Sequence, residues 1–105
     1  MRFVETPIFT RMVRNLLQDE EYRALQLALL LRPEQGVVIP GTSGLRKLRW
    51  GLKGKGKRGG CRVIYYWDRK QETFYMLLVY PKSQQEDLSP AQIKVLSKLV
   101  KEEFK

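Results

Sequence analysis

The sequence predicts an α+β fold, a small and mostly antiparallel sheet with two N-terminal helices on one face and a C-terminal helix. Three observations support this order of β-α-α-β-β-β-α. Residues 8–17 and 19–31 repeat apolar side chains at helical spacing. Residues 61–68 and 73–80 are rich in strand-favouring residues and flank a short polar turn, which is a hairpin signal. The second of these strands is apolar on both alternating faces, so we expect it to be central and covered on both sides.

The N-terminal part is predicted to hold one extended stretch, residues 1–6, followed by two helices. Pro7 ends the extended stretch, and the first helix covers residues 8–17. Asp19 is the predicted N-cap of the second helix, because a short polar side chain there can accept from the first turn. This helix is apolar on more than half of its circumference, which predicts deep packing. It ends at Arg32, because a residue before proline is disfavoured in the helical region.

The C-terminal part is predicted to be mostly strand. Residues 37–39 form either a short strand or an extended loop, residues 45–52 form a strand, and residues 53–60 form a loop of alternating lysine and glycine. Strict alternation in the last strand predicts two faces, one with Tyr75, Leu77 and Val79, the other with Phe74, Met76, Leu78 and Tyr80. The final helix begins with Ser89 as N-cap, Pro90 at its first position and Gln92 completing a capping box.

Length and composition exclude several classes of protein. A chain of 105 residues is expected to form one domain, over residues 1–105. The single cysteine, Cys61, allows no internal disulfide, and with no histidine in the chain it cannot build a zinc site. We expect no metal and no cofactor. Acidic pairs such as Glu20-Glu21 and Glu86-Asp87 fall near helix starts, where their carboxylates interact favourably with the helix dipole. No apolar run reaches the length of a signal peptide or a membrane span, so we expect a cytoplasmic protein with no membrane partner.

The positive charge is concentrated in one window, residues 35–67. This window holds eight of the 20 basic residues and none of the 11 acidic ones, so the rest of the chain is nearly neutral. Like charges held close together repel, and a fold tolerates them mainly when an anionic partner binds there. The alternative is a lysine-rich loop that only keeps the protein soluble. The eight residues are Arg46, Lys47, Arg49, Lys53, Lys55, Lys57, Arg58 and Arg62.

The spacing of glycines and lysines in residues 53–60 favours an extended polyanion over a mononucleotide. Glycines allow the backbone to approach a ligand closely, and the lysines between them surround that approach with ammonium groups. The Walker A spacing is absent and no helix follows, and the dinucleotide fingerprint is excluded for the same reason. A flexible cationic loop followed by a strand is therefore predicted to bind an extended polyanion.

Arg62 differs from the loop lysines, because it lies at the start of a buried strand. Alternation places it on one face with Ile64 and Tyr66. A guanidinium in a covered sheet keeps its charge, so it must meet an anion or the surface. Arg62 either pairs with a carboxylate from a helix or binds a phosphate in a groove lined by the sheet. Tyr66 and Tyr80 could line the same groove and stack on bases, or they could pack in the core.

Several segments together resemble the RelE-like toxins of bacterial toxin–antitoxin pairs, and within them the HigB-type branch. They are G-L-R-K-L-R, K-G-K-G-K-R-G-G-C-R-V-I-Y-Y, L-L-V-Y-P-K and D-L-S. The resemblance covers nearly the whole chain, and the lysine–glycine element is its most specific part. It implies a RelE-like fold and a small endoribonuclease (mRNA interferase) that cuts translated mRNA in the A site of the 30S subunit, next to rRNA. It also implies a reaction without metal, in which the 2′-hydroxyl attacks the adjacent phosphate, and a cognate helix-turn-helix antitoxin.

The resemblance also implies roles for particular residues. Arg62 matches the strand arginine of the family, and Lys82 matches the lysine after the last strand; both are candidates for stabilising charge on the reacting phosphate. The expected RNA-binding residues are Arg46, Lys47, Arg49, Lys53, Arg58, Tyr66 and Tyr80. The essential tyrosine or histidine of some relatives is missing from S-Q-Q-E-D-L-S, so the base must be a lysine, tyrosine or carboxylate. A lysine among cations has its charged form disfavoured, so Lys55 and Lys57 are both candidates.

Two other functions share features of this sequence. A non-catalytic RNA-binding module would have the same basic window and the same salt-dependent affinity. A gyrase-inhibiting toxin of the ParE branch would have the same fold, although it does not need the lysine–glycine loop.

Overall fold

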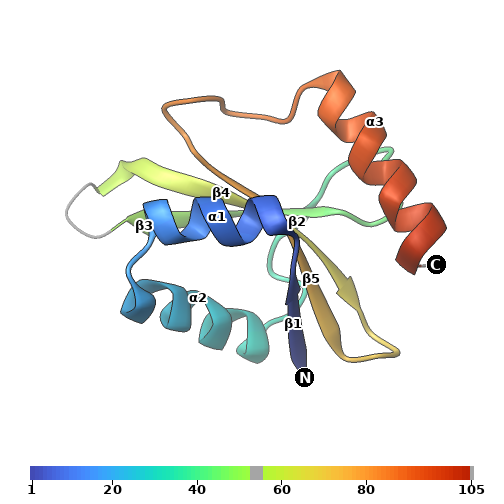
Figure 1. The fold of residues 1–105 in the computed structure, drawn as a ribbon, viewed down its shortest axis with the longest axis horizontal. Helices are drawn as coiled ribbons and strands as arrows, with labels where there is room; N and C mark the ends of the chain where they lie inside the picture. The colour runs from blue at the N-terminus through green and yellow to red at the C-terminus, as the bar shows by residue number, and fades with distance from the viewer. Residues whose placement is uncertain (53–55, 105) are drawn as a thin grey trace.

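The computed structural model describes residues 1–52 and 56–104, and the side chains of residues 1–51 and 60–104. It contains helices and a five-stranded sheet in the strand order β1-β5-β4-β3-β2 (Figure 1). The elements are β1 (Arg2–Glu5), α1 (Pro7–Leu16), α2 (Asp19–Leu31), β2 (Val37–Val38), β3 (Arg46–Leu52), β4 (Gly56–Asp68), β5 (Thr73–Pro81), α3 (Pro90–Leu99) and a terminal π-helical turn η1 (Val100–Phe104).

The sheet confirms the predicted α+β class. β1 pairs with β5 in parallel, whereas β5, β4, β3 and β2 pair successively in antiparallel fashion. The segment 37–39, which the sequence left between strand and loop, contributes the short edge strand β2. Strands β4 and β5 pair with each other, as predicted for a hairpin, and β5 lies inside the sheet, as predicted for the last strand.

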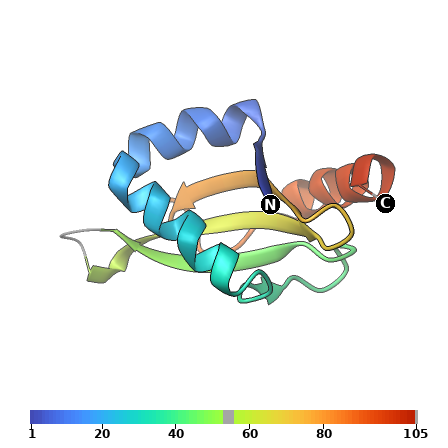
Figure 2. The same ribbon diagram turned by 90° about the horizontal axis from the view of Figure 1, so that it is seen from below.

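Both faces of the sheet are covered. On one face, α1 and α2 bury Phe9, Val13, Leu25 and Leu29 against the sheet residues Val63, Tyr65 and Phe74. On the other face, Ile93, Leu96 and Val100 pack against Leu45, Ile64 and Leu77. Figure 2 shows α1 and α2 together over one side of the sheet, apart from α3. The predicted placement of the helices is therefore confirmed.

A β-bulge in β5 corrects the predicted faces of that strand. Ile64 of β4 pairs with Leu78, but the next residue, Tyr65, pairs with Met76, so Leu77 is the extra residue. As a result Phe74, Met76 and Val79 face α1 and α2, while Leu77 and Tyr80 face α3. Strict alternation failed here because a bulge shifts every later side chain by one face.

The helix starts follow local capping chemistry. The Thr6 side chain accepts from the Phe9 N–H at 3.1 Å, with Pro7 at the first helical position of α1. α2 starts one residue earlier than predicted, because Gln18 is its N-cap and Asp19 is its first residue; the Gln18 N–H donates to the Glu21 carboxylate at 3.0 Å. The predicted capping box of α3 is confirmed, since Ser89 and Gln92 exchange hydrogen bonds.

Two further predictions are wrong in detail. α2 is not deeply packed all round: Leu25 and Leu29 are buried, but Leu27 is 56% and Leu31 is 83% exposed. The lysine–glycine segment is not a loop throughout, because β4 begins at Gly56, which pairs with Leu52 across a register shift. Pairing along the hairpin outweighs the weak strand propensity of glycine and lysine.

Candidate nucleic-acid interface

Strand register brings three cationic side chains of the basic window together on the face that α3 partly covers. Arg49 of β3 pairs with Arg62 of β4, and Arg62 pairs with Tyr80 of β5. Lys47 lies two residues before Arg49, so it shares that face. We call Lys47, Arg49 and Arg62 the basic cluster.

Arg62 is the buried member of the basic cluster, with a residue exposure of 3%. Its neighbours Cys61, Val63 and Ile64 are completely buried and fix the strand at this point. Its Nη2 donates to Glu86 Oε1 at 3.0 Å and its Nη1 to the Cys61 carbonyl at 3.3 Å. Its Nε is buried and has no hydrogen-bond partner among the described residues. One N–H of a fixed guanidinium is therefore left without an acceptor among the described residues.

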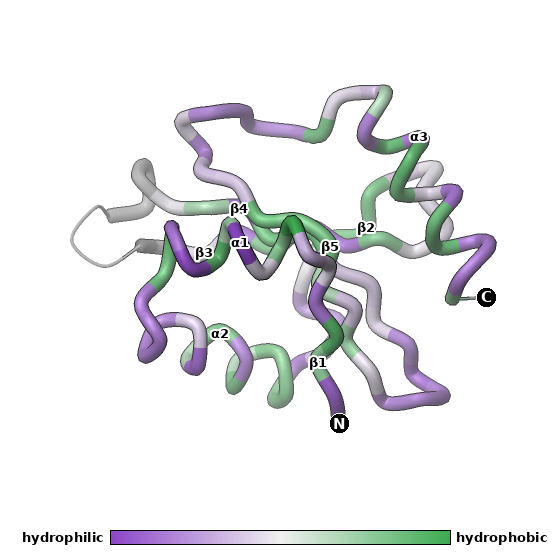
Figure 3. Tube along the Cα trace, viewed as in Figure 1, coloured by the Kyte–Doolittle hydropathy of each residue, from purple (hydrophilic) through white to green (hydrophobic). Residues whose placement is uncertain are grey.

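Two carboxylates from the connection between β5 and α3 face the basic cluster. Glu86 Oε1 lies 3.0 Å from Arg62 Nη2 and 3.9 Å from Arg49 Nη2, and Asp87 accepts a hydrogen bond from the Lys47 ammonium. The carboxylate that pairs with Arg62 thus comes from the connection before α3, not from a helix. We call residues 82–88 the acidic segment; it is hydrophilic along most of its length (Figure 3).

The basic cluster lowers the pKa of both carboxyl groups. The hydrogen bond from Arg62 lowers the pKa of Glu86 below its ordinary value, and the charges of Lys82 and Arg49 act in the same direction. The hydrogen bond from Lys47 likewise lowers the pKa of Asp87. Both groups are therefore ionised at neutral pH.

Tyr80 lies beside Arg62 and is 4% exposed. Its hydroxyl donates to the Glu86 carbonyl at 3.5 Å, a long hydrogen bond. Burial raises the pKa of Tyr80, with the charge of Asp87 adding to the effect. The hydroxyl therefore stays protonated and can act as a donor, but the ring has little free surface on which a base could stack.

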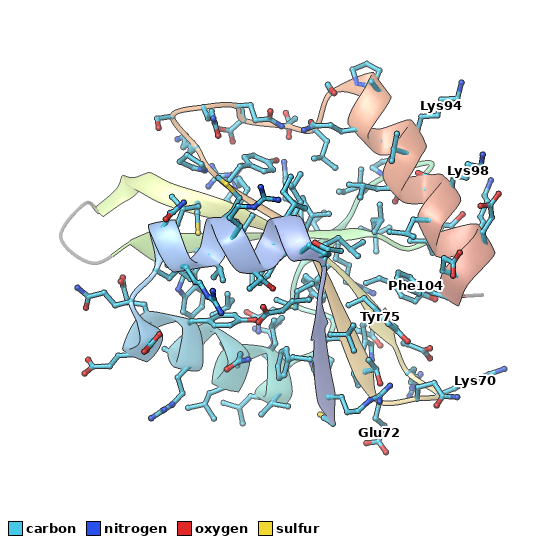
Figure 4. The ribbon with its side chains drawn as sticks, viewed as in Figure 1. Lys70, Glu72, Tyr75, Lys94, Lys98 and Phe104 are labelled. Atoms are coloured by element: carbon cyan, nitrogen blue, oxygen red, sulfur yellow. The ribbon has the colours of Figure 1, made fainter. Side chains whose placement is uncertain are left out.

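The structure separates two other predicted RNA-binding residues from the basic cluster. Arg46 faces the α2 side, where it donates to the Gly36 carbonyl at 2.8 Å and lies 3.6 Å from the Glu34 carboxylate. Tyr66 shares the face of Arg62 but stacks on Phe104 at 5.6 Å between ring centroids. Phe104 in turn stacks on Tyr75, and Figure 4 shows these two rings together at the end of the C-terminal helix. Tyr66 and Tyr80 therefore do not line one groove.

Lys82 follows β5 and is half-buried, and its backbone N–H donates to the Gly60 carbonyl at 3.0 Å. This bond holds the start of the acidic segment against β4, close to Arg62. Four predicted residues lie outside the described part of the chain: Lys53 and Lys55 entirely, Lys57 and Arg58 with their side chains.

The described residues contain no group of three or more potential metal-ligating side chains of histidine, cysteine, aspartate and glutamate. Within the same part of the chain, no helix is long and apolar enough to cross a membrane. Cys61, the one cysteine, is buried on the α1 and α2 face, and burial raises the pKa of its thiol to about 11. It therefore acts as a core residue.

Comparison with known proteins places this arrangement in a family. A family model described as the RelE toxin of the RelE/RelB toxin–antitoxin system matches residues 1–105. The chain belongs to the RelE toxin family. A solved structure of an arginine double mutant of the Escherichia coli toxin RelE in the free state is similar, with a TM-score of 0.59 and 13% identity. The match covers 91% of this chain and 92% of that chain, and it confirms the fold.

Family membership supports the general prediction that the protein is the toxin of a toxin–antitoxin pair, with endoribonuclease activity and an antitoxin partner. The HigB-type branch stays a prediction.

Proposed function

We propose that this protein is a ribosome-dependent mRNA endoribonuclease that inhibits translation by cutting mRNA in the A site. One observation carries the proposal most strongly: Arg62 is 3% exposed, fixed within β4 on the face shared with Arg49 and Lys47, and its Nε has no partner in the described part of the chain. A buried, preorganised guanidinium fork is suited to a phosphate that gains charge in the transition state. Family membership supports the same chemistry.

The proposed reaction is transesterification within the RNA. The 2′-oxygen attacks the adjacent phosphorus, the bond from phosphorus to the 5′-oxygen breaks, and one fragment keeps a 2′,3′-cyclic phosphate. A base takes the 2′-hydroxyl proton, and the departing 5′-oxygen gains a proton. Arg62 and Lys82 stabilise the pentavalent phosphate; Lys55 and Lys57 remain candidates for the base. No step in this scheme requires a metal ion or an organic cofactor.

The proposed partners are mRNA with the surrounding rRNA of the 30S A site, and a cognate helix-turn-helix antitoxin in the cytoplasm. In this setting Lys47 and Arg49 bind phosphates, and the ribosome holds the mRNA in line for attack. We propose the same binding role for Arg46, Lys53 and Arg58, with Arg46 acting from the other face of the sheet. A non-catalytic RNA-binding module is the second candidate, because the basic cluster alone would support it.

Single-turnover cleavage on programmed ribosomes, measured beside ribosome binding, tests the proposal. We expect Arg62→Ala to reduce the cleavage rate ~10²- to 10³-fold, as for loss of a preorganised donor, with only a mild loss of affinity. Arg62→Lys keeps the charge but loses the fork, so we expect it to restore little of the rate. Arg23→Ala, on the exposed side of α2, is the matched control.

Circular dichroism would confirm that each variant is folded. Wild-type cleavage by bound, folded Arg62→Ala would show that Arg62 is only a structural ion-pair residue. Binding without cleavage by the wild-type protein would favour the RNA-binding module.

A further inference from the structure

The basic cluster is already occupied by carboxylates of the same chain. Glu86 contacts both Arg62 and Arg49, and Asp87 contacts Lys47. Each of the three cations that would meet an RNA phosphate thus has an acidic partner from residues 86 and 87. An RNA backbone can reach these cations only by replacing or sharing those partners.

The contact of Glu86 with Arg62 leaves the guanidinium unsaturated. A guanidinium and a carboxylate or phosphate often pair through two parallel hydrogen bonds. Here the guanidinium makes one contact to the carboxylate, Nη2 to Oε1 at 3.0 Å, and the buried Nε has no partner among residues 1–51 and 60–104. A phosphate presents more acceptor oxygens than a carboxylate, so once Glu86 has moved away it could take the Nη2 bond and offer a second oxygen to the neighbouring Nε.

The main chain around Glu86 is held, whereas its side chain is partly exposed to solvent. Leu88 is 8% exposed and packs in the core under α3, Lys82 is bonded to Gly60, and the Gln85 amide donates to Gln92 at 2.9 Å. The Glu86 side chain itself is 45% exposed. It can therefore rotate into water without unfolding the acidic segment or moving α3.

We propose that Glu86 is an internal competitor of RNA: its carboxylate occupies the position of an RNA phosphate on Arg62 and Arg49, and binding exchanges one anion for the other. Asp87 acts in the same way on Lys47. This inference rests on the proposed function, because it concerns the same cationic site.

Because RNA binds only molecules in which Arg62 is uncovered, the apparent affinity is the intrinsic affinity multiplied by the fraction of such molecules. The competing ion pairs are partly exposed, so each is weak and phosphate can displace it. The exchange also replaces one anion on the cation by another and returns a free carboxylate to the solvent, so wild-type binding releases fewer counterions than the number of phosphate contacts suggests.

Equilibrium binding to a short single-stranded RNA with 2′-O-methyl groups, which cannot be cleaved by 2′-hydroxyl attack, tests the inference. We expect Glu86→Gln to bind roughly three- to tenfold more tightly than the wild type at low salt. We also expect a steeper decline of affinity with salt, because one more counterion is released. The double variant Glu86→Gln with Asp87→Asn should extend both effects.

Glu102→Gln is the matched control. Glu102 is 59% exposed and pairs with Lys98, so the change in net charge is the same but none of the proposed RNA-binding residues loses a partner. Equal gains from Glu102→Gln and Glu86→Gln would reduce the effect to general charge and overturn the inference. Unchanged or weaker binding by Glu86→Gln would also overturn it.

The variant Arg62→Ala separates this inference from the proposed function. If RNA binding falls in Arg62→Ala but does not rise in Glu86→Gln, competition is wrong while the RNA site stands. If the wild type and every variant fail to bind this RNA while the wild type cuts mRNA on programmed ribosomes, competition is wrong while the proposed function stands. If the affinity gain of Glu86→Gln disappears in an Arg62→Ala background, the competition acts through Arg62 as proposed.

Discussion

Cys61 and Arg62 are neighbours in the chain but meet different surroundings, because successive residues of β4 point to opposite faces. Cys61 packs in the core under α1 and α2, whereas Arg62 points toward Glu86. Period-two alternation predicted the face of Arg62 from sequence, together with Ile64 and Tyr66. It could not predict Glu86, since the pairing joins residues 24 apart in the chain.

The acidic pair Glu86-Asp87 is a sequence signal with two possible meanings. An acidic pair just before a helix is usually assigned to the helix dipole. Ser89 is the N-cap of α3, so both carboxylates lie outside the helix and are available to other partners. An acidic pair near a helix start, in a chain with a concentrated basic window, is therefore also a candidate for ion pairing across the fold.

The lowered pKa values of Glu86 and Asp87 predict a pH dependence of stability. A carboxyl group whose pKa is lower in the folded state stabilises the fold above its unfolded pKa, roughly 4. That contribution is lost as the pH falls through the folded value. We therefore expect the wild-type free energy of unfolding to fall between pH 5 and pH 3 by more than that of the Glu86→Gln, Asp87→Asn double variant.

Urea unfolding at a series of pH values would measure this difference. Glu34→Gln is the control for the loss of any surface carboxylate. Parallel pH profiles of the wild type and the double variant would contradict the assigned ion pairs.

At the scale of the elements, Tyr65 joins β4 to the segment between α2 and β2. Its ring is completely buried, its hydroxyl donates to the Pro33 carbonyl at 2.8 Å, and it accepts from the Gly36 N–H at 3.0 Å. A Cβ at Gly36 would lie 2.8 Å from the Tyr65 ring, so only glycine fits there. Sequence predicted Tyr65 as a strand residue facing away from Arg62, but not this link.

We predict that Tyr65→Phe lowers the free energy of unfolding by about 1–3 kcal/mol, because a half-buried carbonyl and a buried N–H lose their partner. Tyr75→Phe is the matched control: Tyr75 lies on β5 and packs through its ring on Phe104. We expect that control to change stability by less than about 0.5 kcal/mol. Chemical denaturation of both variants measures the difference, and equal losses would refute the proposed role of the Tyr65 hydroxyl.

The elements themselves were mostly predictable, and the exceptions have physical causes. Helix caps at Ser89 and strand propensity in β4 are local properties, so the sequence shows them. The bulge at Leu77 is stabilised by contacts far along the chain: its carbonyl accepts from the Thr6 hydroxyl at 2.8 Å. The exposed leucines of α2 could not be predicted, because the pattern does not say how much of the helix another element covers.

At the scale of the whole molecule, the basic window of the sequence does not become one uniform surface. Lys47, Arg49 and Arg62 meet carboxylates on the α3 face, and Arg46 lies on the other face. The remaining four side chains of the window lie outside the described residues. The net charge of +9 was predictable from composition, but its division between two faces depends on strand register.

This distribution leads to a last prediction, that the protein cuts translated mRNA but little or no protein-free RNA. The described cations of the α3 face are partly neutralised by Glu86 and Asp87, and the chain has no histidine for general acid–base catalysis. Positioning must therefore supply much of the rate, and a ribosome that holds mRNA in line can provide it. We expect cleavage in step with the reading frame when mRNA 5′ ends are mapped in cells expressing the protein, and none of comparable rate on purified RNA at near-physiological salt. Arg62→Ala, expressed to the same level, is the control for other nucleases. Rapid cleavage of protein-free RNA by the wild type, but not by Arg62→Ala, would show that the protein's own residues suffice and that ribosome dependence is wrong.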